Sequence, residues 1–244
     1  MGAFETIIYE KQDSIGFVTL NRPAALNVYN LKMRDELFEV LTAIKDDNEV
    51  KVVIVRGYGE KAFCAGADLS EFLTAPPPVL AREARFGRDI WTLMANIPQP
   101  LIAALHGYVL GSGIEISLFC DIRIASDDTK FGLPEVALGI IPAAGGTQTL
   151  PRTVGIGGSL DMLLTGRWID AAEACRFKLV NKIVPRKELW TAAESLARKM
   201  SGYSSLALTL AKQAVVRGLD MNLTDGLKLE SHLHRLLDKN INMV

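Results

Sequence analysis

The chain has 244 residues, of which 49% are hydrophobic, which is enough to bury one large core with a small helical appendage. Its formal net charge is −1, from 27 Lys and Arg against 28 Asp and Glu, so no overall field would attract nucleic acid or an anionic membrane. The three cysteines are odd in number and lack a Cys-x-x-Cys pair, which disfavours a disulfide framework and a structural zinc site. The N-terminus has no apolar core of signal-peptide length and no later apolar run approaches a membrane span, so we expect a cytoplasmic protein, or an organellar enzyme that has lost its transit peptide. From the cysteine pattern we expect no bound metal.

The first half of the chain alternates between strand-like and helix-like segments. Two strands are predicted in FETIIYE and IGFVTLN, and a helix over 31–45, where apolar residues recur at helical spacing. The predicted order continues with the strand KVVIVR, a Pro-rich break at 75–78, a helix over 81–95, the strand LIAALHG, a helix from Gly111 and the strand DIRIAS. This alternation predicts parallel strands joined by crossovers, and therefore an α/β core.

The second half is different, because from about Gly158 onward the pattern is almost wholly helical, apart from LVNKIVP. The last 45 or so residues have helical periodicity and no strand to pair with. We therefore predict a core over residues 1–198 and a C-terminal helical domain over 199–244.

Several motifs that suggest other chemistry have simpler interpretations. The run from Gly57 to Ala62 imitates a dinucleotide fingerprint, but 63–66 looks like a second extended segment and not the helix that a fingerprint needs. Cys64 is expected to be a small buried hydrophobe. His232 and His234 point in different directions on a helix, so they are expected at the surface and not as a metal pair.

Two turns rich in small residues follow predicted strands, at 62–68 and 107–115. Small residues let a ligand approach the backbone, and a turn into a helix leaves N–H groups free. Two such donors aimed at one point would form an oxyanion hole for a thioester carbonyl.

Two acids lie in apolar surroundings: Glu115 at the end of the second turn, and Glu135 in the segment FGLPEVALG further along the chain. Glu115 is either a catalytic carboxylate or part of a capping box with Ser112, and Glu135 is either catalytic or an ordinary acid at a helix start after Pro134. As a pair, two carboxyls in apolar surroundings can acquire different pKa values, so that one acts as acid and the other as base.

These segments closely resemble the crotonase, or enoyl-CoA hydratase/isomerase, superfamily. The resemblance extends in family order over about nine tenths of the chain, through the segments NRPAALN, AFCAGADL, HGYVLGSGIE, CDIRIAS, FGLPEVALGIIP, GGTQTLPR and LVNKIVP. It implies a spiral of ββα repeats and a C-terminal helical domain, here shorter than usual for the family. It also implies assembly into trimers, often paired as hexamers.

The resemblance further implies a reaction and a set of site residues. The reaction is addition of water to the 2,3 double bond of an enoyl-CoA, and it needs no cofactor beyond the coenzyme A of the substrate. Glu115 and Glu135 would be the acid and base, and the backbone N–H groups of Ala67 and Ser112 would form the oxyanion hole. Gly111 and Ala143 would border the water. Coenzyme A would contact Arg22, Ala24, Ala25, Leu26, Lys61, Ala62, Ala65, Gly66, Asp68 and Leu69, with its adenine near 61–65.

Three departures from the family pattern stand out. Ser112 and Ala143 each replace a usual glycine and crowd the water site slightly, and Lys178 replaces a helix-ending glycine at a cost of roughly 1 kcal/mol.

The alternatives to a hydratase of this type are a Δ3,Δ2-enoyl-CoA isomerase that uses Glu135 alone and a hydratase or decarboxylase for cyclic acyl-CoA, whose acyl pocket would involve 70–91. A non-catalytic acyl-CoA-binding or assembly protein is the alternative of another class.

Overall fold

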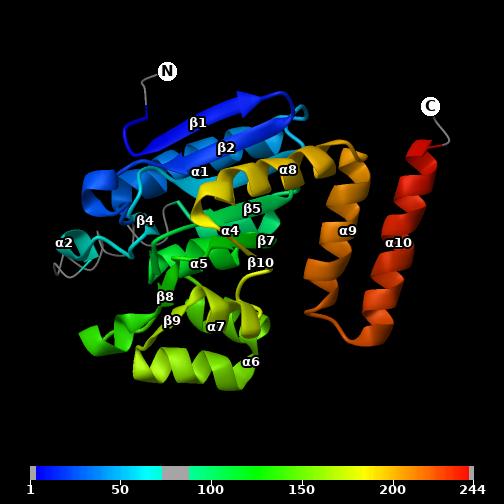
Figure 1. Ribbon diagram of the computed structural model, residues 1–244. Helices are drawn as coiled ribbons and strands as arrows, with labels where there is room; N and C mark the ends of the chain where they lie inside the picture. Colours follow the sequence, from blue (N-terminus) through cyan, green and yellow to red (C-terminus); the bar gives the residue numbers. More distant parts are fainter. Residues whose placement is uncertain (1–3, 73–87, 242–244) are drawn as a thin grey trace.

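The computed structural model describes residues 4–72 and 88–241 of the chain (Figure 1). The predicted break at 75–78 and residues 81–87 of the predicted helix over 81–95 therefore lie outside the described residues. No described helix is both long enough and apolar enough to cross a membrane.

A six-stranded sheet forms the main layer, in the order β1-β2-β3-β5-β7-β10. From β2 to β10 every neighbouring pair is parallel, and β1 is an antiparallel edge strand. The strands are β1 (Ile7–Gln12), β2 (Ile15–Leu20), β3 (Val52–Gly57), β5 (Leu101–Leu105), β7 (Ile122–Ser126) and β10 (Lys182–Val184). The predicted parallel α/β core is confirmed.

The chain also forms a smaller sheet, in the order β4-β6-β8-β9. Its strands β8 and β9 lie below the larger sheet in Figure 1. Its strands are β4 (Ala62–Cys64), β6 (Tyr108–Leu110), β8 (Lys130–Gly132) and β9 (Trp168–Asp170). The first three are parallel, and β9 is antiparallel to β8. The strand β9 corrects the expectation that the chain after Gly158 is helical apart from LVNKIVP, because three residues are too few to show a period-2 pattern.

Helices cover both faces of the larger sheet. On one face α1 (Leu31–Asp46) buries Met33, Leu37, Val40, Leu41 and Ile44, the stripe expected from the sequence. On the other face α8 (Leu189–Ser201) buries Leu189, Ala193 and Ala197 against the alternate residues of the strands. The predicted domain boundary at 198/199 falls inside α8, and the division into domains stays a prediction.

The remaining helices connect or extend these layers. They are η1 (Pro23–Ala25), α2 (Leu69–Phe72), α4 (Ile90–Asn96), α5 (Ser112–Leu118), η2 (Pro134–Leu138), α6 (Gly146–Thr165), α7 (Ala171–Arg176), η3 (Arg186–Glu188), α9 (Ser205–Gly218) and α10 (Leu223–Ile241). Figure 1 shows α9 and α10 packed side by side, apart from the sheets.

The helix predicted over 81–95 is interrupted within its described part. Arg88 is in a bend, and α4 begins only at Ile90. The reason is Asp89, whose carboxylate accepts hydrogen bonds from the backbone N–H groups of Trp91 and Thr92 and so caps the start of the helix.

Candidate active site

Three neighbouring parallel strands of the smaller sheet end at the same edge, and each leads directly into a predicted site residue. The strand β4 is followed by Ala67, β6 by Ser112 and β8 by Glu135. Carboxyl ends of parallel strands are where α/β proteins commonly place binding groups. The topology therefore gathers residues that are far apart in the sequence.

Gly111 is the point at which these three connections meet. Its φ of 48° is in a region that L side chains rarely adopt. A Cβ atom built on Gly111 would lie 2.9 Å from Oε1 of Glu135 and 3.3 Å from Cα of Gly66. Only glycine lets the turn after β4, the turn after β6 and the Glu135 carboxyl approach so closely.

The two predicted oxyanion donors lie in these adjoining turns. The backbone N–H of Ala67 donates no hydrogen bond within the part of the chain that the structure describes. Ser112 begins α5, and the first N–H groups of a helix have no partner inside the helix. Ser112 also avoids positive φ, so it replaces the usual glycine without backbone strain.

Glu115 lies within α5 and is only 2% exposed. Its Oε1 accepts hydrogen bonds from the backbone N–H groups of Ala144, at 2.8 Å, and Gly146, at 2.9 Å, at the start of α6. The capping-box alternative is therefore not what the structure contains, because the cap of α5 is Gly111 and the carboxylate is used by a different helix. Burial raises the pKa of Glu115, and the two backbone N–H groups oppose that rise.

Glu135 lies in η2, whose first residue is Pro134, as expected from the sequence. Burial raises the pKa of this carboxyl to about 7, and the nearby negative charge of Glu115 raises it further. Its Oε2 is buried with no hydrogen-bond partner among the described residues. A buried carboxyl oxygen without a partner is costly, which suggests that a ligand supplies one.

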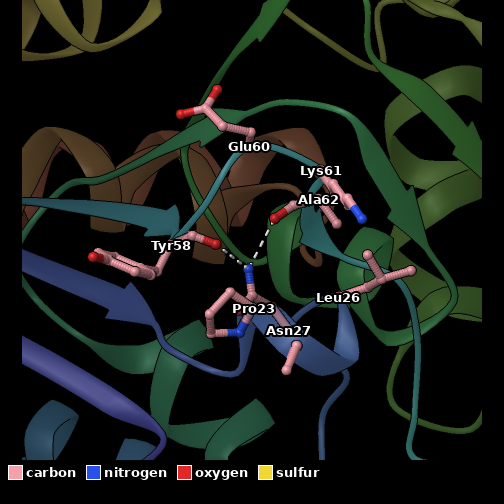
Figure 2. A pocket seen from close by; sticks show the side chains of 8 residues that line it. Pro23, Leu26, Asn27, Tyr58, Glu60, Lys61 and Ala62 are labelled. Atoms are coloured by element: carbon pink, nitrogen blue, oxygen red, sulfur yellow. Dashed lines mark hydrogen bonds between the residues drawn. The ribbon is translucent and has the colours of Figure 1, made fainter.

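The chain also has a cavity of about 250 Å³, whose lining includes none of these residues. Figure 2 shows the side chains that line it. It is lined by Pro23, Ala24, Leu26, Asn27, Tyr58, Glu60, Lys61 and Ala62. Four of the predicted coenzyme-A contacts, Ala24, Leu26, Lys61 and Ala62, are in this lining. Asn27, Tyr58 and Glu60 were not predicted as contacts. Asn27 ends the segment NRPAALN, and Tyr58 and Glu60 lie in the glycine-rich turn at 57–62.

The other predicted contacts lie outside this lining. Ala25 shares the η1 turn, while Ala65, Gly66 and Leu69 lie along the chain from β4 to α2. The guanidinium of Arg22 is paired with Asp68 at 3.0 Å and also donates to the carbonyl of Val28, so both charges are already balanced. Ala143 is exposed and precedes Ala144, which binds Glu115.

Of the simpler interpretations, Cys64 is fully buried, as expected, and burial raises the pKa of its thiol to about 12. A thiol that stays protonated is a poor nucleophile. His232 and His234 are exposed, also as expected.

Comparisons with known proteins agree with the resemblance in the sequence. The profile of the enoyl-CoA hydratase/isomerase family matches residues 10–242. A probable enoyl-CoA hydratase of Mycobacterium bovis is 40% identical over 94% of this chain and 88% of its own length. A short-chain-enoyl-CoA hydratase of Clostridium acetobutylicum is 41% identical over 92% and 86%. The crystal structure of enoyl-CoA hydratase from Bacillus anthracis has a TM-score of 0.89 at 38% identity, covering 94% of this chain and 90% of the other.

Proposed function

Because this chain belongs to the enoyl-CoA hydratase/isomerase family, we propose that it is an enoyl-CoA hydratase that adds water across the 2,3 double bond of a short enoyl-CoA thioester. The observation that carries the proposal is the pair of buried carboxyls, Glu115 and Glu135, beside the turns that contain Ala67 and Ser112. The charge of Glu115 raises the pKa of Glu135. An isomerase needs only one of these carboxyls, whereas hydration needs one as the base and the other as the acid.

In the proposed reaction, the N–H groups of Ala67 and Ser112 bind the thioester oxygen and draw electron density from C3. The oxygen of water forms a bond to C3 while one of its protons moves to Glu115, which is the base. The electron pair of the double bond moves towards the thioester as an enolate. Protonated Glu135 then delivers its proton to C2, and the proton on Glu115 returns to Glu135, so that one water has been added and both acids are restored.

The assignment of the two roles follows from the surroundings of each carboxyl. Glu115 accepts two backbone hydrogen bonds, which favour its ionised form, as a base requires. Glu135 has a pKa of about 7, so a large fraction is protonated at neutral pH, as an acid requires. A water bound between them would also satisfy the unpaired Oε2 of Glu135.

We place the nucleotide end of coenzyme A in the cavity between the η1 turn and the turn before β4. Lys61 is exposed at its rim and forms no ion pair with a described residue, so its ammonium is available to a phosphate. Arg22 is the weaker candidate, because Asp68 already neutralises it. The thioester would then extend past Gly66 to the two glutamates.

The products formed from crotonyl-CoA and from a 3-enoyl-CoA test the proposal. We expect crotonyl-CoA to be converted to the 3-hydroxyacyl thioester, identified by chromatography and by the mass of one added water. Rapid conversion of the 3-enoyl-CoA to the 2-enoyl isomer with no hydration of crotonyl-CoA would instead establish the isomerase alternative.

We also propose that the protein works as a homotrimer or a dimer of trimers. Large apolar side chains are widely exposed on one chain: Ile141 66%, Ile156 72%, Leu164 70%, Leu219 80% and Leu223 79%. Exposed apolar residues in such number, on the η2–α6 region and at the turn between α9 and α10, are typical of surfaces that pack against another chain.

A further inference from the structure

The turn that forms one wall of the cavity is held in place through all of its carbonyl groups. Each of the five backbone carbonyls of residues 58–62 accepts a hydrogen bond from a group outside the turn. The side chain of Asn27 donates to the carbonyls of Tyr58 and Ala62. The His106 ring donates to Gly59, the Arg186 guanidinium to Glu60, and the backbone N–H of Tyr108 to Lys61. An irregular turn on a protein surface does not need such complete anchoring.

Asn27 connects the two walls of the cavity. Its Nδ2 donates to the carbonyls of Tyr58, at 2.9 Å, and Ala62, at 2.8 Å, as the dashed lines in Figure 2 show. Its Oδ1 accepts from the backbone N–H of Arg22, at the start of the opposite wall. The side chain is 1% exposed, and the residue has a φ of 56°, a left-handed conformation that asparagine tolerates better than most residues.

His106 holds the same turn from its other side. Its Nε2 is 2.9 Å from the carbonyl of Gly59, and because a carbonyl can only accept, Nε2 carries the hydrogen. Its backbone carbonyl accepts from the N–H of Phe63, and its ring meets the ring of Trp190 edge-on at 5.4 Å. The side chain is fully buried, which lowers its pKa to about 4, so it stays a neutral donor at physiological pH.

We propose that Asn27 and His106 are positioning residues for substrate: they hold the turn at 58–62 in the shape that receives the nucleotide end of coenzyme A, and neither takes part in the chemistry. This inference rests on the proposed function only for the identity of the ligand. A turn fixed in advance loses little conformational freedom on binding, so its anchors contribute to affinity. The acyl end of the substrate lies by the glutamates and does not depend on them.

A truncated substrate separates positioning from general damage to the fold. Crotonyl-pantetheine carries the thioester but lacks the nucleotide, so it does not use the turn. His106→Phe keeps an aromatic ring beside Trp190 and removes the donor to Gly59, and Asn27→Asp keeps the shape but replaces the Nδ2 donor by an oxygen. For each variant we expect the Kd of coenzyme A, measured by calorimetry, to rise on the order of 10-fold, with kcat/KM for crotonyl-pantetheine within about twofold of the wild type.

Two further variants serve as rescue and control. His106→Gln retains an N–H donor at a similar reach and should recover most of the affinity for coenzyme A. Thr129→Val removes a buried hydrogen bond to the carbonyl of Leu105, next to His106, without touching the turn, and should leave affinity unchanged. If His106→Phe fails to fold, His106→Leu takes its place as the variant without a donor, and Asn27→Asp tests the same turn independently.

The possible results lead to different conclusions. Unchanged affinity for coenzyme A in both donor-removing variants, or an equal loss of activity with crotonyl-pantetheine and crotonyl-CoA, would overturn the positioning role. A wild type that binds coenzyme A but does not hydrate crotonyl-CoA would contradict the proposed function alone. In that case the Kd values for coenzyme A still decide whether Asn27 and His106 position it.

Discussion

Glu115 and Glu135 differ in what surrounds them, and this difference carries the proposed mechanism. Glu115 is anchored by two backbone N–H groups, while Glu135 has an oxygen with no partner among the described residues. Buried carboxyls with such unequal hydrogen bonding divide acid and base roles between them. Since both carboxyls take part in the proposed reaction, the pH dependence of the rate reports on both.

The alkaline limb of the pH profile should report Glu135. This group must be protonated to act as an acid, and burial holds its pKa in the free enzyme at about 7, so kcat/KM should fall as the pH rises through about 7. A second fall in kcat/KM at low pH is expected as Glu115 loses its charge. Steady-state rates at low concentrations of crotonyl-CoA, from about pH 5 to pH 9, measure the profile. A kcat/KM that stays constant or increases up to the alkaline end would be inconsistent with an acid role for Glu135.

Gly111→Ala should harm both activity and stability. The new Cβ atom would lie 2.9 Å from Oε1 of Glu135, on a backbone with a φ of 48°, at a cost of about 1–3 kcal/mol in the free energy of unfolding. We expect kcat to fall at least about 10-fold because the Glu135 carboxyl is displaced. Gly139→Ala is the matched control, because Gly139 also has a positive φ but no atom within 4 Å of its added Cβ. Equal effects on kcat in the two variants would argue against a close fit at Gly111.

At the level of single residues, sequence motifs identified the candidate acids and the glycine between the turns, but not the anchors of the cavity. Glu115 and Glu135 are visible as acids in apolar segments. Asn27 and His106 act on the turn at 58–62, which is more than 30 residues away from either of them. No local pattern encodes that approach, because it depends on how the strands are stacked.

Among the elements, α6 has a role beyond packing. The N–H groups that bind Glu115 belong to Ala144, just before the helix, and to Gly146, its first residue. Gly146 also allows the carboxylate to approach, since a Cβ there would lie 3.0 Å from Oε1. The positive end of a helix also favours the ionised form of a nearby carboxylate. The helix therefore helps to keep Glu115 in the state that a base requires.

The end of α7 gives a test of element stability. Lys178 follows the helix with a φ of 62°, and its backbone N–H donates to the carbonyl of Cys175. Lys178→Gly should raise the free energy of unfolding by about 1 kcal/mol, because glycine adopts this conformation without steric cost. Urea unfolding measures the change, and Lys178→Ala, which keeps the Cβ, should show no gain. A glycine variant no more stable than the alanine variant would refute this explanation.

Long elements were predictable from the sequence and short ones were not. The helix α1 has a full apolar stripe, and β2, β3 and β5 are apolar runs of five or six residues. By contrast, β6, β8 and β9 have three residues each, and they form a sheet only because neighbouring segments supply their partners. The sheet that organises the site was therefore the part that periodicity could not reveal.

At the scale of the whole molecule, the alternation of strands and helices predicted a parallel α/β core, but the order of strands in two sheets required the structure. The family resemblance added the spiral fold, and the match to solved structures confirms it. The surface of a single chain exposes apolar residues of η2, α6, α9 and α10.

The exposed apolar residues predict that several copies of the chain assemble through this surface. Light scattering after size-exclusion chromatography should give three or six chain masses. Replacing Leu219 and Leu223 by glutamate should yield smaller species with unchanged circular dichroism, because charges would be buried at the contact. Replacing the same two residues by methionine keeps apolar side chains of similar size and should preserve the assembly. A monomeric wild type would disprove the proposed oligomer.

The most direct test of the central claim is the loss of absorbance of the enoyl thioester of crotonyl-CoA, compared between the wild type, Glu115→Gln and Glu135→Gln. Glutamine keeps the size of each side chain but cannot exchange a proton, so each variant should lower kcat about 100-fold to 10,000-fold while the protein still folds and binds coenzyme A. Wild-type hydration with near-silence in both variants is the predicted result. Hydration that survives in either folded variant, or an inactive wild type, would contradict the two-glutamate hydratase.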